Sequence, residues 1–168
     1  MIRKLLMVSC ITRALGGCAS YDGRGLAPGS STGQDVEALM GPAAMRSPQS
    51  DGSTVLYFPR GPEGRHTFAV TIGPEGRMRA IDQRLTLANY SKLMAGTTTS
   101  KEVRELFGPA DPGSMTYLPR QQREVWEYKW LDYQQKRVFW FQFSDDGILR
   151  EALNSRDDFH ESPGAAMP

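Results

Sequence analysis

Cysteine is nearly absent from this sequence. Its two thiols are Cys10 and Cys18, and no residue after position 18 is a cysteine. The rest of the chain can therefore form no disulfide and can use no thiol as a catalytic nucleophile. Histidine is almost as scarce, with only His66 and His160, and a zinc site needs three or four placed ligands. We expect no metal site and no cofactor.

Charge of one sign is also missing. The formal net charge is +1, with acidic and basic residues interspersed, so the chain lacks the basic stripe that is typical of nucleic-acid-binding proteins. The G-x-S-x-G, P-loop and H-E-x-x-H motifs are missing as well. These absences argue against nucleic-acid binding and against an enzyme.

The first eighteen residues, MIRKLLMVSCITRALGGC, have the residue pattern of a secretory signal peptide. Arg3 and Lys4 precede a short apolar run, and small residues follow it before Cys18, as in a signal peptide. The run is too short for a membrane-spanning helix, which needs about 20 apolar residues. We therefore predict that residues 1–17 direct export and are then removed.

The end of this leader, LGGC at residues 15–18, resembles the bacterial lipobox. The resemblance implies cleavage between Gly17 and Cys18 and acylation of Cys18, and two or more acyl chains anchor a protein stably. Because Ala19 is not aspartate, it also implies sorting to the outer membrane, facing the periplasm. Arg13 departs from the pattern, since a charge weakens insertion of the apolar run. An ordinary signal peptide, or a leader with a wrongly assigned start, is the alternative.

Two segments of the sequence are closely similar. Residues 29–43 read GSSTGQDVEALMGPA and residues 96–110 read GTTTSKEVRELFGPA, at an offset of 67. Thr32 and Thr99 each have an acidic residue three positions later, which predicts a capping box at each helix start. A Gly-Pro pair then ends each copy. Each copy predicts a helix of about two turns, too short to be stable unless its apolar stripe packs on another element.

Alternating aromatic residues follow each helix. Residues 124–132 alternate Trp and Tyr with charged residues, and residues 136–153 place phenylalanines on one face and turn at an Asp-Gly pair. The first copy repeats this pattern at an offset of 71, which pairs Tyr57 with Tyr128 and leaves four extra residues between helix and sheet in the second copy. Each copy therefore predicts a meander of three antiparallel strands.

The predicted fold class is α+β, with two tandem units that each pack short helices on one face of a three-stranded antiparallel sheet. A further helix, expected over residues 85–96, has no full counterpart in the first unit, so the first helix of that unit is reduced. The predicted divisions are a signal peptide at 1–17, a flexible tether at 18–28, a first unit at 29–83, a second unit at 84–154 and a disordered tail at 155–168.

The second unit resembles the SmpA/OmlA (BamE-like) family of small outer-membrane lipoproteins. The resemblance lies in LTLANYSKLMAGTTTSKEVRELFGPA followed by WEYKW and FWFQFSDDGIL, and residues 29–81 match more loosely. It implies two helices on a three-stranded sheet, no active site, and a scaffolding role beside the machinery that folds β-barrels into the outer membrane. This chain departs from the family in carrying two copies. Tandem units also resemble the plan of secreted β-lactamase inhibitor proteins, so a periplasmic module that inhibits or regulates an enzyme is the alternative.

A protein partner would need an exposed apolar surface. Trp140 lies between two core-facing phenylalanines, so alternation places it with Val138 on the face opposite the core. Trp and Tyr dominate binding hot spots, and the predicted partner-binding residues are Trp140, Val138, Tyr133 and Trp130. Two alternatives stay open: Trp140 fills the joint between the units or lies under the C-terminal tail, and Trp130 belongs to the core.

Overall fold

The computed structural model of the chain describes residues 21–157. The predicted signal peptide, its cleavage position at Gly17, the lipidation residue Cys18 and most of the predicted tail lie outside the described residues.

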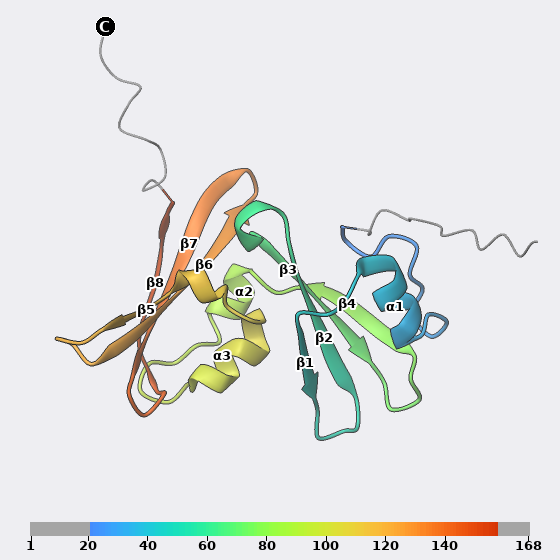
Figure 1. The fold of residues 1–168 in the computed structure, drawn as a ribbon, viewed down its shortest axis with the longest axis horizontal. Helices are drawn as coiled ribbons and strands as arrows, with labels where there is room; N and C mark the ends of the chain where they lie inside the picture. Colours follow the sequence, from blue (N-terminus) through green and yellow to red (C-terminus); the bar gives the residue numbers. More distant parts are fainter. Residues whose placement is uncertain (1–20, 158–168) are drawn as a thin grey trace, which may run out of the picture.

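Each half of the described chain folds into one antiparallel sheet of four strands in sequential order (Figure 1). The first half contains α1 (Gly33–Met40), β1 (Met45–Pro48), β2 (Thr54–Arg60), β3 (His66–Ile72) and β4 (Met78–Gln83). The second half contains α2 (Leu87–Tyr90), α3 (Ser100–Phe107), β5 (Met115–Leu118), β6 (Arg123–Asp132), β7 (Gln135–Ser144) and β8 (Leu149–Arg156). Two 3₁₀ turns, η1 (Pro62–Gly64) and η2 (Pro112–Ser114), complete the described elements.

The predicted α+β fold class, with three-stranded sheets packed by helices, is wrong. The described chain is mostly β, with two four-stranded sheets and three helices of eight, four and eight residues. The sequence pattern missed β1 and β5, which have four residues each and read MRSP and MTYL. Neither has an alternating apolar run, because both are edge strands with few buried side chains.

The helix expected over residues 85–96 is also much shorter than predicted. Only Leu87–Tyr90 is helical, and Ser91 forms its C-cap. Hydroxyl groups compete with the helix for backbone partners in the following residues, since Ser91 donates to the Ala88 carbonyl and Thr98 accepts from the Met94 amide. Such local bonds offer the chain an alternative to the helical ladder.

The two halves repeat one hydrogen-bonding pattern. Both predicted capping boxes are confirmed, at Thr32 and at Thr99. Each N-cap residue forms an isolated bridge to the residue just before the last strand of its half, Thr32 to Arg77 and Thr99 to Ile148. A register shift also recurs at the same place, between Thr71 and Ile72 and between Gln142 and Phe143. The repetition therefore extends to irregularities that a generic meander would not share.

The sequence alignment of the two copies is wrong by one residue at β2. Leu56 pairs with Val70, and Trp126 pairs with Phe141, so Leu56 corresponds to Trp126 and Phe58 to Tyr128. The offset in this strand is thus 70, not 71. Because a one-residue slip moves a side chain to the other face of a sheet, Tyr57 is not the counterpart of Tyr128.

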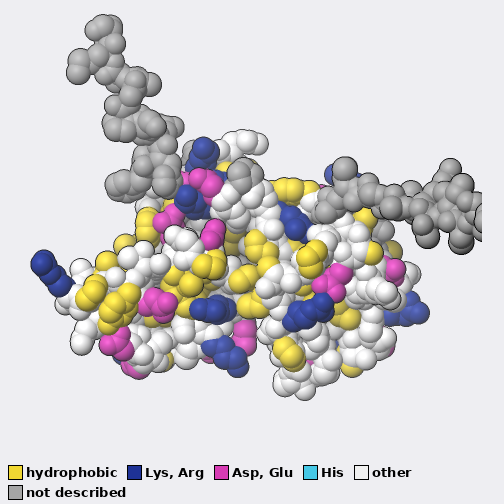
Figure 2. All heavy atoms as spheres, in the orientation of Figure 1, with side chains coloured by type: hydrophobic (Ala, Val, Ile, Leu, Met, Phe, Trp, Pro, Cys, Tyr) yellow, Lys and Arg dark blue, Asp and Glu magenta, His cyan; other side chains and the backbone are white. Residues whose placement is uncertain are grey.

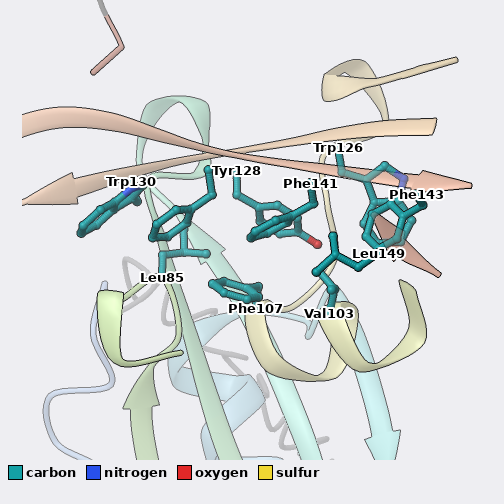
Figure 3. Packing of buried hydrophobic residues seen from close by; sticks show 10 residues of the cluster. Leu85, Val103, Phe107, Trp126, Tyr128, Trp130, Phe141, Phe143 and Leu149 are labelled. Carbon is teal, nitrogen blue, oxygen red and sulfur yellow. The ribbon is translucent and has the colours of Figure 1, made fainter. Parts of the chain in front are cut away.

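Each sheet buries one face against its own helix. In the first half, Val36 and Met40 of α1 pack with Leu56, Phe58, Val70 and Ile72. In the second half, Val103 and Phe107 of α3 lie against the row of aromatic side chains from β6 and β7 (Figure 3). The centroid of the Phe107 ring lies 5.1 Å from that of Phe141 and 5.7 Å from that of Phe139. The short helices thus gain from tertiary packing the stability that they lack in isolation.

The first sheet also buries its second face, because α3 lies between the two sheets (Figure 1). Val55, Tyr57 and Ala69 form a separate buried cluster on this face. The Tyr57 hydroxyl donates to the Glu105 carbonyl of α3 at 2.6 Å. The described chain is therefore a stack of α1, first sheet, α2 with α3, and second sheet.

The ends of the described chain also contact the folded body. Within the predicted tether, Gly23 is buried, and Leu26 packs against the hydrophobic core between α1 and the first sheet. At the other end, β8 continues to Arg156, and the Asp157 amide donates to the Lys136 carbonyl at 3.1 Å. Residues 21–28 and 155–157 thus belong structurally to the two halves.

Two equivalent glycines allow the contact between the halves to be tested. Gly41 and Gly108 both end a helix with positive φ, 80° and 90°, in a region that costs other residues about 1–3 kcal/mol. A Cβ on Gly108 would lie 2.7 Å from Thr67 Cγ2 and 3.1 Å from Tyr57 Cδ1, whereas a Cβ on Gly41 would meet nothing within 4 Å. We expect Gly108→Ala to lower the free energy of unfolding by about 1–3 kcal/mol more than Gly41→Ala, measured by urea denaturation. Equal losses would contradict close packing of α3 on the first sheet.

Candidate protein-binding surface

The outer face of the second sheet is the side that points away from α3. Three rows of directly paired residues from β6, β7 and β8 cross it: Val125–Gln142–Glu151, Glu127–Trp140–Leu153 and Lys129–Val138–Ser155. The corresponding face of the first sheet is buried by α3. No other element of the described chain covers the middle row in the same way, since Leu153 is 46% exposed there.

Trp140 occupies the centre of this face and is half-buried. Its Nε1 donates to the Ser155 hydroxyl at 3.3 Å. Its partner in the pairing is Leu153, so an indole and an exposed leucine lie side by side. The residue at the corresponding position of β3 is Ala69, which is fully buried. The second sheet therefore presents a bulky aromatic group where the first presents a methyl group.

The structure separates the four predicted partner-binding residues. Trp130 is 3% exposed and stacks on Phe139 with centroids 4.6 Å apart, so it lies in the core, on the face opposite Trp140. Val138 is on the outer face but only 2% exposed. Tyr133 is 95% exposed in the β6–β7 turn, where its φ of 55° is left-handed. Only Trp140 and Tyr133 of the four offer surface to a partner.

Leu153 belongs to this face and was missed by the sequence interpretation. The available sequence signal was the alternation along β8, in which Leu153 lies between Ala152 and Asn154. The structure then pairs Leu153 with Trp140. Tyr117 on the edge strand β5 is 52% exposed but pairs with Glu124, in register with Phe143, so it lies on the opposite face of the sheet, where its hydroxyl donates to Asp145 at 3.1 Å. Figure 2 shows hydrophobic side chains gathered over this end of the molecule, among charged side chains of both signs.

One end of the outer face is occupied by the first half of the chain. Lys129 pairs with Glu63 of η1 at 3.3 Å and with Glu127 at 3.8 Å. Arg65 pairs with Glu63 and with Asp157, which follows β8. Arg65 and Asp157 are 6% and 7% exposed, so this ion pair is buried.

The ionisation of Glu63 reflects these partners. Burial acts to raise its pKa, but hydrogen bonds from Arg65 and Lys129 outweigh that effect and leave the pKa below its ordinary value of 4.5. The carboxylate is therefore charged at neutral pH and holds the β2–β3 hairpin to β6 by electrostatic attraction.

A groove of about 840 Å³ lies beside this charged contact, between the two halves. Its walls are the β2–β3 hairpin, the loop from α3 to β5 and part of β6, and they include Pro59, Gly61, Thr67, Pro109, Pro112 and Tyr128. The Tyr128 hydroxyl is not available to a ligand in the groove without loss of a bond, because it donates to the Gly108 carbonyl at 2.9 Å.

Tyr21 forms a second polar contact at the start of the described chain. Its hydroxyl lies 2.7 Å from His66 Nδ1, and its ring meets the rings of His66 and Phe68 edge-on. Burial lowers the pKa of His66 below its ordinary value of 6.5, so the imidazole is neutral at pH 7.

Among residues 21–157, no group of three or more His, Cys, Asp or Glu residues is placed to hold a metal ion. No helix in the same range has the length and apolar character needed to cross a membrane.

Comparisons with known proteins give no identification. No protein-family model matches the chain, and neither the curated proteins nor the solved structures yield a match. The resemblance to the SmpA/OmlA family therefore stays a prediction.

The buried ion pair between Arg65 and Asp157 can be tested by a double-mutant cycle. Arg65→Met leaves a buried carboxylate unpaired, which we expect to cost about 3–5 kcal/mol in the free energy of unfolding. Asp157→Asn should be costly as well, and the double variant should lose less than the sum of the two. Arg79→Met is the control, because its pairs with Asp51 and Glu75 are exposed and exposed ion pairs contribute little to stability. Additive losses from Arg65 and Asp157 would contradict a direct pair.

The environment of His66 predicts a pH dependence. Because its pKa is lower in the folded chain than the ordinary 6.5, the unfolded chain binds a proton more readily, and stability falls as pH decreases through 6.5. His66→Gln removes this titration. We expect the urea midpoint of the natural chain to fall between pH 7.5 and pH 5.5 by more than that of the variant. Equal shifts in the two proteins would show that His66 is not held in its neutral form.

Proposed function

We propose that the protein is a lipid-anchored, periplasm-facing outer-membrane protein of the SmpA/OmlA type, which acts as a non-catalytic scaffold in outer-membrane protein assembly. The observation that carries the binding role is the open outer face of the second sheet, with Trp140 half-buried beside the exposed Leu153. A scaffold acts through contacts, and this face provides the contact surface.

The first sheet supplies an internal precedent for such a contact. Its corresponding face is covered by a short helix, with a tyrosine hydroxyl bonded to a helix carbonyl at 2.6 Å. The second sheet has the same strand arrangement, and its outer face places Trp140 and Leu153 between two rows that carry polar groups. Gln142 and Glu151 lie on one side, and Lys129, paired with Glu63 of the first half, lies on the other. A central aromatic residue within a polar rim is the usual arrangement of a binding hot spot.

The membrane attachment rests on the leader. An anchor at Cys18 needs no apolar protein surface, because each buried methylene of an acyl chain contributes about 0.8 kcal/mol. The described body would then stand in the periplasm and meet its partner through the second sheet.

The anchor and the contact surface are tested separately in cells that export the full chain. We expect mass spectrometry of the mature N-terminus to show an acylated Cys18. The Cys18→Ser variant should be absent from the membrane fraction. An unmodified Cys18 would remove the lipid anchor.

For the contact surface, a photo-crosslinking residue replaces Leu153, with Lys101 as the control site because its side chain is 85% exposed and lies on α3. We expect crosslinks to a component of the β-barrel assembly machinery from position 153 only. Trp140→Ala should weaken this capture by about tenfold or more, as the loss of a hot-spot residue does. Crosslinks to a β-lactamase or a peptidoglycan hydrolase would favour the inhibitor alternative, and equal yields at both sites would exclude this face.

A further inference from the structure

The chain is fastened to its first half almost as soon as it leaves Cys18. Besides the 2.7 Å contact between the Tyr21 hydroxyl and His66 Nδ1, the Tyr21 carbonyl accepts from Arg60 Nε at 3.3 Å. The hydroxyl also faces Gly61, where an added Cβ would lie only 3.0 Å from it. Tyr21 thus contacts both strands of the β2–β3 hairpin.

The next residues continue this attachment. Gly23 is buried, and a Cβ there would lie 2.7 Å from Ile81 Cδ1. The Leu26 amide donates to the Gly23 carbonyl at 3.0 Å, as the Leu93 amide donates to the Tyr90 carbonyl at 3.1 Å in the second half. Residues 21–28 therefore dock on the first sheet in the same way that the α2 segment docks on the second.

This attachment sets the length of free chain below the anchor. Only Ala19 and Ser20 separate Cys18 from the seated Tyr21, and the three residue steps from Cys18 to Tyr21 span at most about 10 Å. An 11-residue flexible tether would instead allow an average excursion of about 18 Å in any direction. A lipid on Cys18 would thus hold the seated segment close to the bilayer surface.

We propose that the Tyr21 end of the first half, with Arg24 and the β2–β3 hairpin, forms the surface that faces the lipid headgroups. This inference rests on the proposed lipid anchor at Cys18. Arg24 has a side chain that is 90% exposed and lies 4.0 Å from the half-exposed Asp22, and Tyr21 is 47% exposed. A cation in a weak exposed pair and an amphipathic ring are thus available at the headgroup level.

The strands fix which parts of the chain lie farthest from this surface. β2 runs from Thr54 to Arg60 and β3 from His66 to Ile72, so the turns at Gly52 and Gly76 lie at the opposite end of these strands from the hairpin. The η1 end of the hairpin also pairs with Lys129 at one end of the outer face, so that face stands beside the headgroup surface. The short anchor therefore directs the turns at Gly52 and Gly76 away from the bilayer.

The test uses the mature chain from Cys18 to Pro168, in which Cys18 is the single thiol. Cys18 is coupled to a maleimide lipid in nanodiscs that contain a headgroup-attached paramagnetic lipid, and amide signals are compared by NMR before and after reduction of the label. We expect loss of the Arg24 and Gly61 signals and retention of the Gly52 and Gly76 signals, which lie at the opposite end of β2 and β3.

Two variants serve as controls. A Gly-Ser insertion of about 12 residues between Ala19 and Ser20 lengthens the tether and should make the attenuation weak and uniform. Tyr21→Ala should reduce the contrast, whereas Tyr21→Phe keeps the ring and should preserve most of it. Uniform attenuation in the natural chain would overturn the proposed orientation even if Cys18 is acylated in cells. An unacylated Cys18 with the expected NMR contrast would instead remove the anchor and leave the seating of Tyr21 intact.

Discussion

The structure depends on the burial of both faces of the first sheet. One face packs on α1, and the other packs on α3 of the second half, where Tyr57 bonds the Glu105 carbonyl and Gly108 allows close approach. A sheet covered on both sides must be apolar on both sides, and β2 accordingly reads as a nearly continuous buried run. This requirement joins the two halves into one stack.

The two halves show how a duplicated unit diverges without losing its packing. In the second half Tyr90 covers Ala152, to whose carbonyl its hydroxyl donates at 2.8 Å. In the first half the corresponding positions hold Gly23 and Ile81. A large residue over a small one has been exchanged for a small residue under a large one, so the isoleucine fills part of the space that the tyrosine ring takes in the second half. Such a compensating exchange limits the cavity that a loss of side-chain volume would otherwise leave.

Local signals in the sequence predicted local features well. The capping boxes at Thr32 and Thr99, and the core position of the aromatic residues on β7, follow from side-chain chemistry and strand alternation. The edge strands could not be predicted, because four-residue strands with exposed side chains have no periodic signal. The one-residue error at Tyr57 had a physical cause as well: a strand buried on both faces offers no alternation to fix its alignment. The pair of Arg65 with Asp157 joins residues 92 positions apart, and nothing in either local sequence indicates the other.

The corresponding faces of the two sheets differ in what can pack on them. Ala69 lets α3 approach the first sheet, and its counterpart Trp140 fills the corresponding space on the second. A further helix layer could not approach this face in the geometry that α3 uses, so the second sheet ends the stack, as capping repeats do in other repeat proteins. The chain consequently has two unlike ends. One end carries α1, and the other carries an aromatic surface that the described chain leaves open. In the proposed scaffold, this open face is the surface that receives a partner.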